Sequence, residues 1–385
     1  DLNKAKGGNR RPEGRLSTMF TANSIRNVCL LGHSGSGKSA LAESLLYMTG
    51  AIDRIGKNAD GNTVSDYDPE EIRRNISIST SLIPLTYKNM KINLLDTPGG
   101  FDFSGAVMEA LRAADAAIIV CSAKDGITVG FEKAWKYCEE RNMPCFIYIS
   151  KVDEENADYN VTFNALRERY GNRIAPVVVP IWDDNHKVTG IIDVLNKRAF
   201  EMQNLKRVEI PVPEGKESVI TEFNDALKES VAETSDEFMD KFFGGEDFTY
   251  AEMIKGLHTG VVTRTLFPVL CGSGVTCLGS LMLMDHILDL FPNPVEGNYH
   301  KATTADGKTE EFVVSPRGVP AAYVFKIVSD QYGKYSYIKV HPGPTHPDTT
   351  LVNARPGATE NLGRLSHMYA RSAMHAQRPS TPTIC

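Results

Sequence analysis

One eight-residue stretch constrains the fold of this chain more than any other. The stretch Gly32-His33-Ser34-Gly35-Ser36-Gly37-Lys38-Ser39 fits the phosphate-binding pattern G-x-x-x-x-G-K-[ST] at every fixed position. The apolar run 28–31 before it predicts a buried strand, and the run 40–47 after it predicts a helix. This order favours a phosphate loop over a plain Gly/Ser-rich connection. The glycines let backbone N–H groups turn inward, and the helix N-terminus adds its positive dipole end.

A nucleotide bound here is expected to lay its phosphates along the loop. Lys38 is expected to reach the β- and γ-phosphates, and the Ser39 hydroxyl is expected to bind Mg²⁺. The residues predicted to line the nucleotide at this loop are Gly32, His33, Ser34, Gly35, Ser36, Gly37, Lys38, Ser39 and Ala40.

A second motif follows the apolar run 91–95, which predicts another strand. Asp96-Thr97-Pro98-Gly99-Gly100 places a carboxylate at the end of that strand, before a Pro-Gly turn. Asp96 is expected to hold Mg²⁺ through water, and the Gly99 N–H is expected to face the γ-phosphate. A plain β-turn has the same local sequence, but the position downstream of the phosphate loop favours the nucleotide site. Between the two motifs, the polar segment 50–67 has no steady period and predicts a long functional or mobile loop.

Two later segments carry residues suited to a purine base. Ser150-Lys151-Val152-Asp153 follows an apolar run and resembles the guanine-reading motif N-K-x-D. Asp153 could accept hydrogen bonds from N1–H and the 2-amino group of guanine, with the Lys151 stem along the base. An exposed Lys-Asp pair has the same local sequence, so that alternative stays open. Gly272-Ser273-Gly274 resembles a further base loop, whose backbone N–H meets guanine O6.

Apolar strands and helical stretches alternate through most of the chain. A third strand is predicted at 116–120, a helix at 129–141 and a further strand at 145–149. This alternation predicts an α/β fold with a mostly parallel sheet covered on both faces, and ligands beyond the carboxyl ends of its strands. From residue 299 onward the pattern changes to alternating short strands, which predicts a small β-barrel.

Composition restricts the class of protein. A chain of 385 residues predicts two or three domains, and no apolar stretch approaches the ~20 residues of a membrane span. The seven cysteines have no C-x-x-C spacing, which favours reduced thiols in a cytoplasmic protein. The net charge of −6 gives no global positive field for nucleic acid, so no DNA partner is expected. Residues 1–18 are polar and aperiodic and predict a leader or disordered tail.

Taken together, these motifs resemble a translational GTPase, and further stretches narrow the resemblance to the elongation factor G family. Asp96–Phe103 reads D-T-P-G-G-F-D-F, similar to that family's D-T-P-G-H-V-D-F, and the closing segment 268–294 is also similar. The resemblance covers residues 20–294. It implies a GTP-binding G domain over 19–295, with an inserted α+β subdomain at roughly 175–262. It also implies a β-barrel second domain over 296–385, so the chain is expected to be an N-terminal fragment of such a factor.

Four positions depart from the family pattern. Gly100 stands where the family has the His that orients the attacking water, and Gly35 stands where many relatives carry an assisting Asp. Ser150 replaces the motif's Asn, which is expected to remove one hydrogen bond between this loop and the phosphate loop. Ser77 replaces the Mg²⁺-binding Thr and keeps its hydroxyl, so it joins Ser39 and Asp96 as a predicted metal residue.

The sequence therefore predicts a monomeric, cytoplasmic GTPase that uses GTP/GDP and Mg²⁺ and acts on the ribosome, with no membrane partner. Lys38 and Gly99 are the predicted catalytic groups, and hydrolysis is expected to be slow because of Gly100. Translocation, ribosome splitting and ribosome protection are the roles considered. Two alternatives remain: a ribosome-associated GTP sensor that barely hydrolyses, and an ATP-using P-loop enzyme.

Overall fold

The computed structural model describes residues 20–296 continuously and residues 300–384 with gaps. The segment 1–18, which was expected to be a leader or disordered tail, lies outside the described residues. Among the described parts of the chain, no helix has the length and apolar character needed to cross a lipid bilayer.

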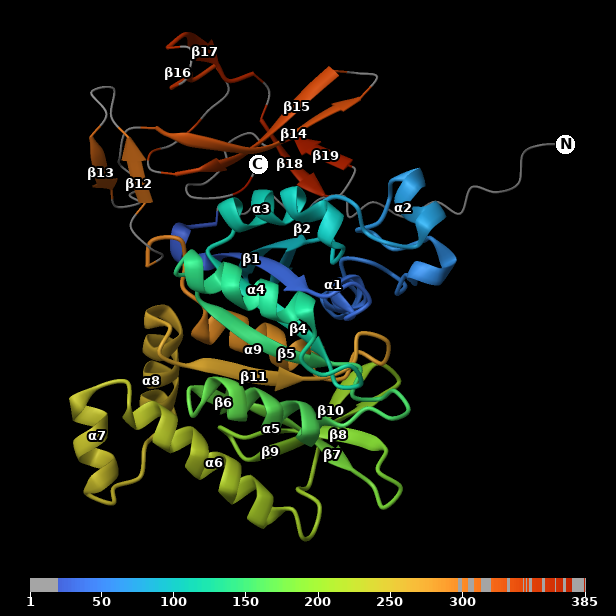
Figure 1. Cartoon of the computed structure of the whole chain (residues 1–385), viewed down its shortest axis with the longest axis vertical. Coiled ribbons are helices and arrows are strands. Elements are labelled where there is room, and N and C mark those ends of the chain that lie inside the picture. The colour runs from blue at the N-terminus through green and yellow to red at the C-terminus, as the bar shows by residue number, and fades with distance from the viewer. Residues whose placement is uncertain are drawn as a thin grey trace, which may run out of the picture.

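A seven-stranded sheet forms the centre of the first part of the chain (Figure 1). Its strands run in the order β2-β3-β1-β4-β5-β11-β6, and every neighbouring pair is parallel except β2 with β3. The strands are largely apolar because helices cover both faces, and this confirms the predicted α/β fold. The strands are β1 (Ile25–Gly32), β2 (Ser81–Tyr87), β3 (Met90–Asp96), β4 (Ala116–Ser122), β5 (Cys145–Ser150), β6 (Ile174–Pro176) and β11 (Phe267–Cys271).

Helices lie on both faces of this sheet. In Figure 1, α3, α4 and α5 lie in front of the sheet and α9 lies behind it, where α1 packs against α9. The hydroxyls of Ser44 on α1 and Ser280 on α9 join these two helices at 2.9 Å. The helices are α1 (Lys38–Met48), α2 (Pro69–Arg74), α3 (Ser104–Ala113), α4 (Val129–Glu140), α5 (Tyr159–Tyr170) and α9 (Ser280–Leu290), with short 3-10 turns η1 (Ala22–Ser24), η2 (Asn58–Asp60) and η3 (Phe101–Phe103).

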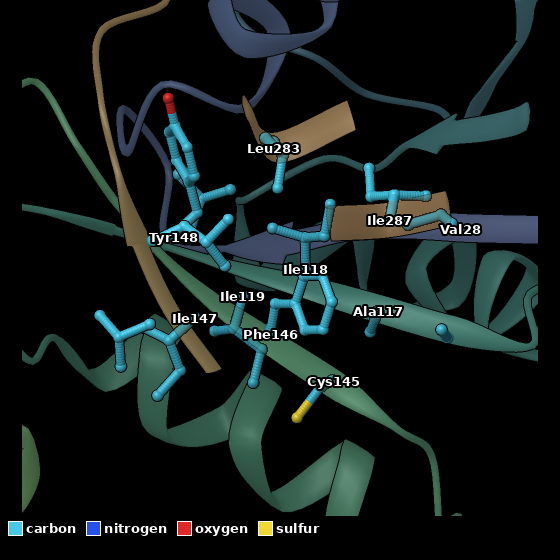
Figure 2. Close-up of a cluster of buried hydrophobic side chains, with 14 of the residues drawn as sticks. Val28, Ala117, Ile118, Ile119, Cys145, Phe146, Ile147, Tyr148, Leu283 and Ile287 are labelled. Carbon is cyan, nitrogen blue, oxygen red and sulfur yellow. The ribbon is translucent and has the colours of Figure 1, made fainter. Parts of the chain in front are cut away.

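Fully buried aliphatic and aromatic side chains fill the space between the sheet and α9. Figure 2 shows Val28, Ile118 and Phe146 from three neighbouring strands gathered with Leu283 and Ile287 of α9. Burying each such side chain stabilises the fold by about 1.5–3 kcal/mol. This packing fixes the relative positions of the strands whose carboxyl ends carry the predicted motifs.

A second, antiparallel sheet lies between β6 and β11 along the chain. Its strands run in the order β10-β9-β8-β7, and three helices follow it in sequence. The inserted subdomain was expected over roughly 175–262; residue 175 lies in β6 of the central sheet, and the second sheet begins at Val178. The elements are β7 (Val178–Trp182), β8 (Val188–Asp193), β9 (Arg198–Gln203), β10 (Lys206–Ile210), α6 (Glu217–Ala232), α7 (Asp236–Phe243) and α8 (Tyr250–Thr263).

Beyond residue 299 the described strands form antiparallel pairs, which confirms a later domain of β-strands; closure into a barrel stays a prediction. Two buried lysines connect these strands to the first part of the chain. Lys326 Nζ donates to the Thr80 carbonyl, and Lys339 Nζ forms an ion pair with Asp115. The strand pairs are β12 (His300–Thr303) with β13 (Thr309–Phe312), β14 (Ala322–Asp330) with β15 (Gly333–Val340), β16 (Thr350–Val352) with β17 (Thr359–Asn361), and β18 (Ser366–Tyr369) with β19 (Ser372–His375).

Candidate phosphate- and base-binding site

The predicted phosphate loop connects β1 to α1 at the carboxyl edge of the central sheet. Gly32 is the last residue of β1, residues 33–37 form the loop, and Lys38–Ala40 lie in the first turn of α1. Gly32 and Gly37 have left-handed backbones, with φ of 143° and 95°, a region that favours glycine. A side chain on Gly32 would also meet the Val120 carbonyl oxygen at 2.5 Å. The glycine spacing thus permits the tight turn that brings the backbone N–H groups of the helix start toward one point.

Lys38 lies buried against this loop. Its ammonium group donates to two loop carbonyls, at 2.9 and 3.2 Å. Burial lowers the pKa of Lys38 to about 8, although the carboxylates of Asp96 and Asp66 act to raise it. Gly99 lies so close that a Cβ on it would stand 2.6 Å from Lys38 Nζ. The structure therefore brings together Lys38 and Gly99, the two groups predicted to face the terminal phosphate.

The three predicted metal residues also come together beside Lys38. Ser39 Oγ lies 3.3 Å from Ser77 Oγ. Asp96 is 1% exposed, and neither of its carboxylate oxygens has a hydrogen-bond partner among the described residues. Burial and the neighbouring Asp66 carboxylate raise the pKa of Asp96 to about 7, and the charge of the Lys38 ammonium group opposes this rise. A buried carboxylate without a partner is costly, so this position suits a cation.

Asp66 belongs to this cluster and was not predicted from the sequence. Its carboxylate accepts a hydrogen bond from Asn58 at 2.7 Å, and burial raises its pKa while the Ser77 hydroxyl lowers it. In the sequence it is one of several aspartates in a polar segment, and no spacing distinguishes it from the others. The described residues contain no group of three or more His, Cys, Asp or Glu side chains that could hold a metal. Mg²⁺ needs fewer protein ligands, because it is usually bound through one or two carboxylates together with phosphates.

Two further buried carboxylates order the long segment 50–78, and sequence reasoning missed both. Glu43 on α1 accepts hydrogen bonds from the backbone N–H groups of Gly56 and Val64, at 2.8 and 2.5 Å. Glu71 on α2 accepts from two N–H groups shortly before β2, at 2.9 and 3.1 Å. Each of these glutamates is 1% exposed. Glu43 thus ties the segment to α1, and Glu71 orders its end, where Ser77 lies beside Ser39.

The first base-reading segment follows β5, and one prediction about it was wrong. Ser150 was expected to lose the tie to the phosphate loop, but its hydroxyl donates to the Ser36 carbonyl at 2.6 Å. The serine side chain is shorter than asparagine, but it still makes this hydrogen bond because the base-reading segment and the phosphate loop lie close together. Lys151 has a left-handed backbone and pairs with Glu154 at 3.3 Å. Among the described residues the Asp153 carboxylate has no hydrogen-bond or ion-pair partner, so it is available to a ligand.

The second base-reading segment, Gly272–Gly274, lies against α1 and the first base-reading segment. The Val152 N–H points to the Gly272 carbonyl at 3.5 Å, which places the two segments side by side. A Cβ on Gly274 would stand 2.6 Å from the carbonyl carbon of Ala40. The Ser273 hydroxyl accepts from two N–H groups of its own turn, at 3.2 and 3.1 Å. The predicted base residues therefore lie next to the predicted phosphate residues.

At Gly100 the backbone can accept a side chain. Its φ of −76° and ψ of 139° suit any residue, and an added Cβ would contact only the Phe103 ring, at 3.1 Å. A shallow hollow lies alongside, lined in part by Phe101 and Lys133. The His33 ring faces Phe101 with 5.9 Å between ring centroids, and its Nδ1 is buried without a partner among the described residues. The backbone at position 100 thus accepts a Cβ, provided that the Phe103 ring shifts slightly.

Three comparisons with known proteins give consistent results. The family model described as "Elongation factor Tu GTP binding domain" matches residues 23–293. A Thermotoga maritima protein described as "Elongation factor G-like protein" is 34% identical over 349 residues, which cover 90% of this chain and 49% of that protein. A crystal structure of a Thermus thermophilus protein matches with a TM-score of 0.83 and 31% identity, covering 94% of this chain and 52% of that one. The chain spans about half the length of these relatives.

Proposed function

We propose that this chain, which belongs to the elongation factor G-like group of translational GTPases, is a GTP- and Mg²⁺-dependent switch that acts on the ribosome. The observation that carries the proposal is the convergence of Ser39, Ser77, Asp66 and Asp96 beside the phosphate loop. Translocation, ribosome splitting and ribosome protection are the roles that such a switch would serve.

The cluster suits Mg²⁺ because its polar atoms are oxygens and its net charge is negative. Asp96 offers two buried carboxylate oxygens without a partner among the described residues, and the hydroxyls of Ser39 and Ser77 lie beside it. Oxygen ligands with one or two carboxylates are what Mg²⁺ takes in nucleotide sites. Bound there, the ion would neutralise charge on the β- and γ-phosphates. Ser39, Ser77 and Asp96 are the residues proposed to hold it, with Asp66 as an additional acceptor.

The switch would depend on Lys38 and the backbone of Gly99. Nucleotide phosphates would take over the hydrogen bonds that the Lys38 ammonium now donates to carbonyls of the phosphate loop. The Gly99 N–H would then face the γ-phosphate, so the segment 97–104 would adopt one position with GTP and another with GDP. The segment 50–78 would respond as well, because it carries Asp66 and Ser77.

Guanine is the proposed base. Asp153 has two acceptor oxygens without partners among the described residues, and they match the N1–H and 2-amino donors of guanine. The hydrogen bond from Ser150 to Ser36 also ties the base segment to the phosphate loop, although Ser replaces the motif's Asn. Both observations weigh against the ATP-using alternative.

Hydrolysis of bound GTP is proposed to be slow. Gly100 lacks the side chain that would orient the attacking water, and the His33 ring faces Phe101. An orienting or acid–base group typically contributes about 10²–10⁴-fold to the rate. The second candidate function, a ribosome-associated GTP sensor with little hydrolysis, rests on the same glycine.

The proposed organisation of the chain is a G domain over 19–295 with an inserted subdomain, followed by a β-barrel over 296–385. The proposed partner is the ribosome, through its RNA and proteins, and we propose a monomer in the cytoplasm with no DNA or membrane partner.

Single-turnover GTP hydrolysis tests the proposal, measured with and without bacterial ribosomes for the wild type and Gly100→His. We expect both proteins to bind GTP, and Gly100→His to hydrolyse it about 10²–10⁴-fold faster on the ribosome. Lys38→Ala is the control that separates binding from chemistry. A wild type that hydrolyses GTP at ordinary translational-GTPase rates, with no gain in Gly100→His, would contradict slow hydrolysis, whereas a wild type that does not bind GTP would contradict the switch itself.

A further inference from the structure

The Tyr148 hydroxyl is a buried polar group without an evident structural purpose. Tyr148 is fully buried in β5, and its hydroxyl has no hydrogen-bond partner among the described residues. Figure 2 shows its ring at the edge of the apolar cluster, with the oxygen pointing away from Phe146 and Ile147. A buried hydroxyl without a partner costs stability, and a phenylalanine would fill the same apolar space at no such cost.

The Tyr148 hydroxyl lies next to Gly272, the first residue of the second base-reading segment. A Cβ on Gly272 would stand 2.4 Å from the Tyr148 oxygen and 2.1 Å from the Leu278 carbonyl oxygen. Gly272 must therefore be a glycine, because the tyrosine and the Leu278 carbonyl occupy the place of its side chain. That carbonyl already accepts from the Ser273 N–H at 2.9 Å. The Tyr148 oxygen thus lies against the backbone of Gly272, on the side where a side chain would project.

The same point is where the two base-reading segments meet. The Gly272 N–H donates to Ile149 at 3.1 Å, and the Gly272 carbonyl lies 3.5 Å from the Val152 N–H. On its other side the segment touches α1, because Gly274 packs against the backbone of Ala40. The segment Gly272–Gly274 therefore contacts α1 through Gly274 and the Tyr148 hydroxyl through Gly272. A shift at Gly272 would move the N–H groups that follow it.

We propose that Tyr148 is a positioning residue for guanine: its hydroxyl supports Gly272, so that an N–H of Gly272–Gly274 meets the O6 atom of the base. This inference rests on the proposed function, because it assigns a role within the same nucleotide site. Tyr148 itself touches no base. Without its oxygen, a gap the size of one atom would open under Gly272, and the segment would settle away from O6.

The test compares three nucleotides with the wild type and Tyr148→Phe by calorimetric titration. GDP carries O6, 6-thio-GDP replaces O6 with a weaker acceptor, and IDP lacks only the 2-amino group that Asp153 is proposed to read. We expect Tyr148→Phe to bind GDP about three- to tenfold more weakly, the range of one neutral hydrogen bond. The preference for GDP over 6-thio-GDP should shrink, while the preference for GDP over IDP should stay unchanged.

Tyr159→Phe is the matched control, because Tyr159 is also buried and its hydroxyl also has no partner among the described residues. It packs against Phe163 and Trp182, so its change should leave all three affinities as they are. Equal losses for GDP, 6-thio-GDP and IDP, or a large drop in melting temperature, would show that Tyr148 only supports the fold. Unchanged GDP binding by Tyr148→Phe would also overturn the inference. A wild type without any preference for GDP over IDP would instead contradict the guanine assignment on which it rests.

Discussion

Replacing Ser150 with alanine tests how strongly the base-reading segment is coupled to the phosphate loop. The Ser150 hydroxyl is buried and donates to the Ser36 carbonyl at 2.6 Å, with the Cys121 carbonyl at 3.3 Å. Alanine removes this donor and leaves a buried carbonyl of the phosphate loop without it, which costs about 1–3 kcal/mol. A bound nucleotide would contact both the base-reading segment and the phosphate loop, so a shift of one relative to the other would lower its affinity. We therefore expect the affinity for GDP to fall about tenfold, which corresponds to about 1.4 kcal/mol.

Calorimetric titration with GDP measures this difference, and thermal unfolding of each variant shows whether the fold itself has changed. Ser150→Thr keeps the hydroxyl and is the matched control, expected to bind GDP as the wild type does. If Ser150→Ala bound GDP with wild-type affinity and melted at the same temperature, the hydrogen bond would not couple the two segments.

Three other predictions concern the base, the phosphates and acid stability. GDP should bind more than tenfold tighter than ADP, since each hydrogen bond to the charged Asp153 contributes about 1.5–3 kcal/mol; equal affinities in the same titration would argue against guanine. Lys38→Ala should abolish GDP binding because the phosphate charge loses its cation, whereas Ser39→Ala should only weaken the dependence of affinity on Mg²⁺; normal GDP binding by Lys38→Ala would make the loop structural. The hydrogen bond from Lys241 lowers the pKa of Glu252 to about 2, so the stability it contributes is present above pH 4.5 and is lost as pH falls toward 2. Acid titration of unfolding should show this loss in the wild type and not in Glu252→Gln.

The sequence was sufficient to predict the central sheet and the edge at which the candidate site residues gather. The phosphate loop, Asp96 and the base segments each follow an apolar run, and in a parallel sheet such runs end at one edge. The order of the strands did not need to be known for this inference. The motifs meet because every strand that carries one points the same way.

The residues that sequence reasoning missed act through contacts that no spacing reveals. Asp66 lies in a long polar segment that Glu43 ties to α1 and that Glu71 orders before β2. The tie from Ser150 could not be foreseen either, since it depends on a distance between two loops rather than on the type of residue. The Ser150 hydroxyl can take the place of an asparagine amide because the backbones of Ser150 and Ser36 lie close enough for this hydrogen bond. The packing of the sheet sets that distance.

At some glycines of the site a side chain would clash with the fold, and at others it would not. Gly99 and Gly274 cannot carry a side chain, because a Cβ would stand 2.5 Å from the Ser34 nitrogen in one case and 2.6 Å from the Ala40 backbone in the other. Gly100 is different, since its backbone suits any residue and a Cβ would press only lightly on Phe103. A Cβ at Gly35 would meet nothing within 4 Å, although its φ of 77° favours glycine. Packing therefore explains Gly99 and Gly274, but it does not explain the absence of a side chain at Gly100. The fold would accept a Cβ at position 100, so we expect the absence of a side chain there to bear on the proposed slow hydrolysis rather than on the stability of the site.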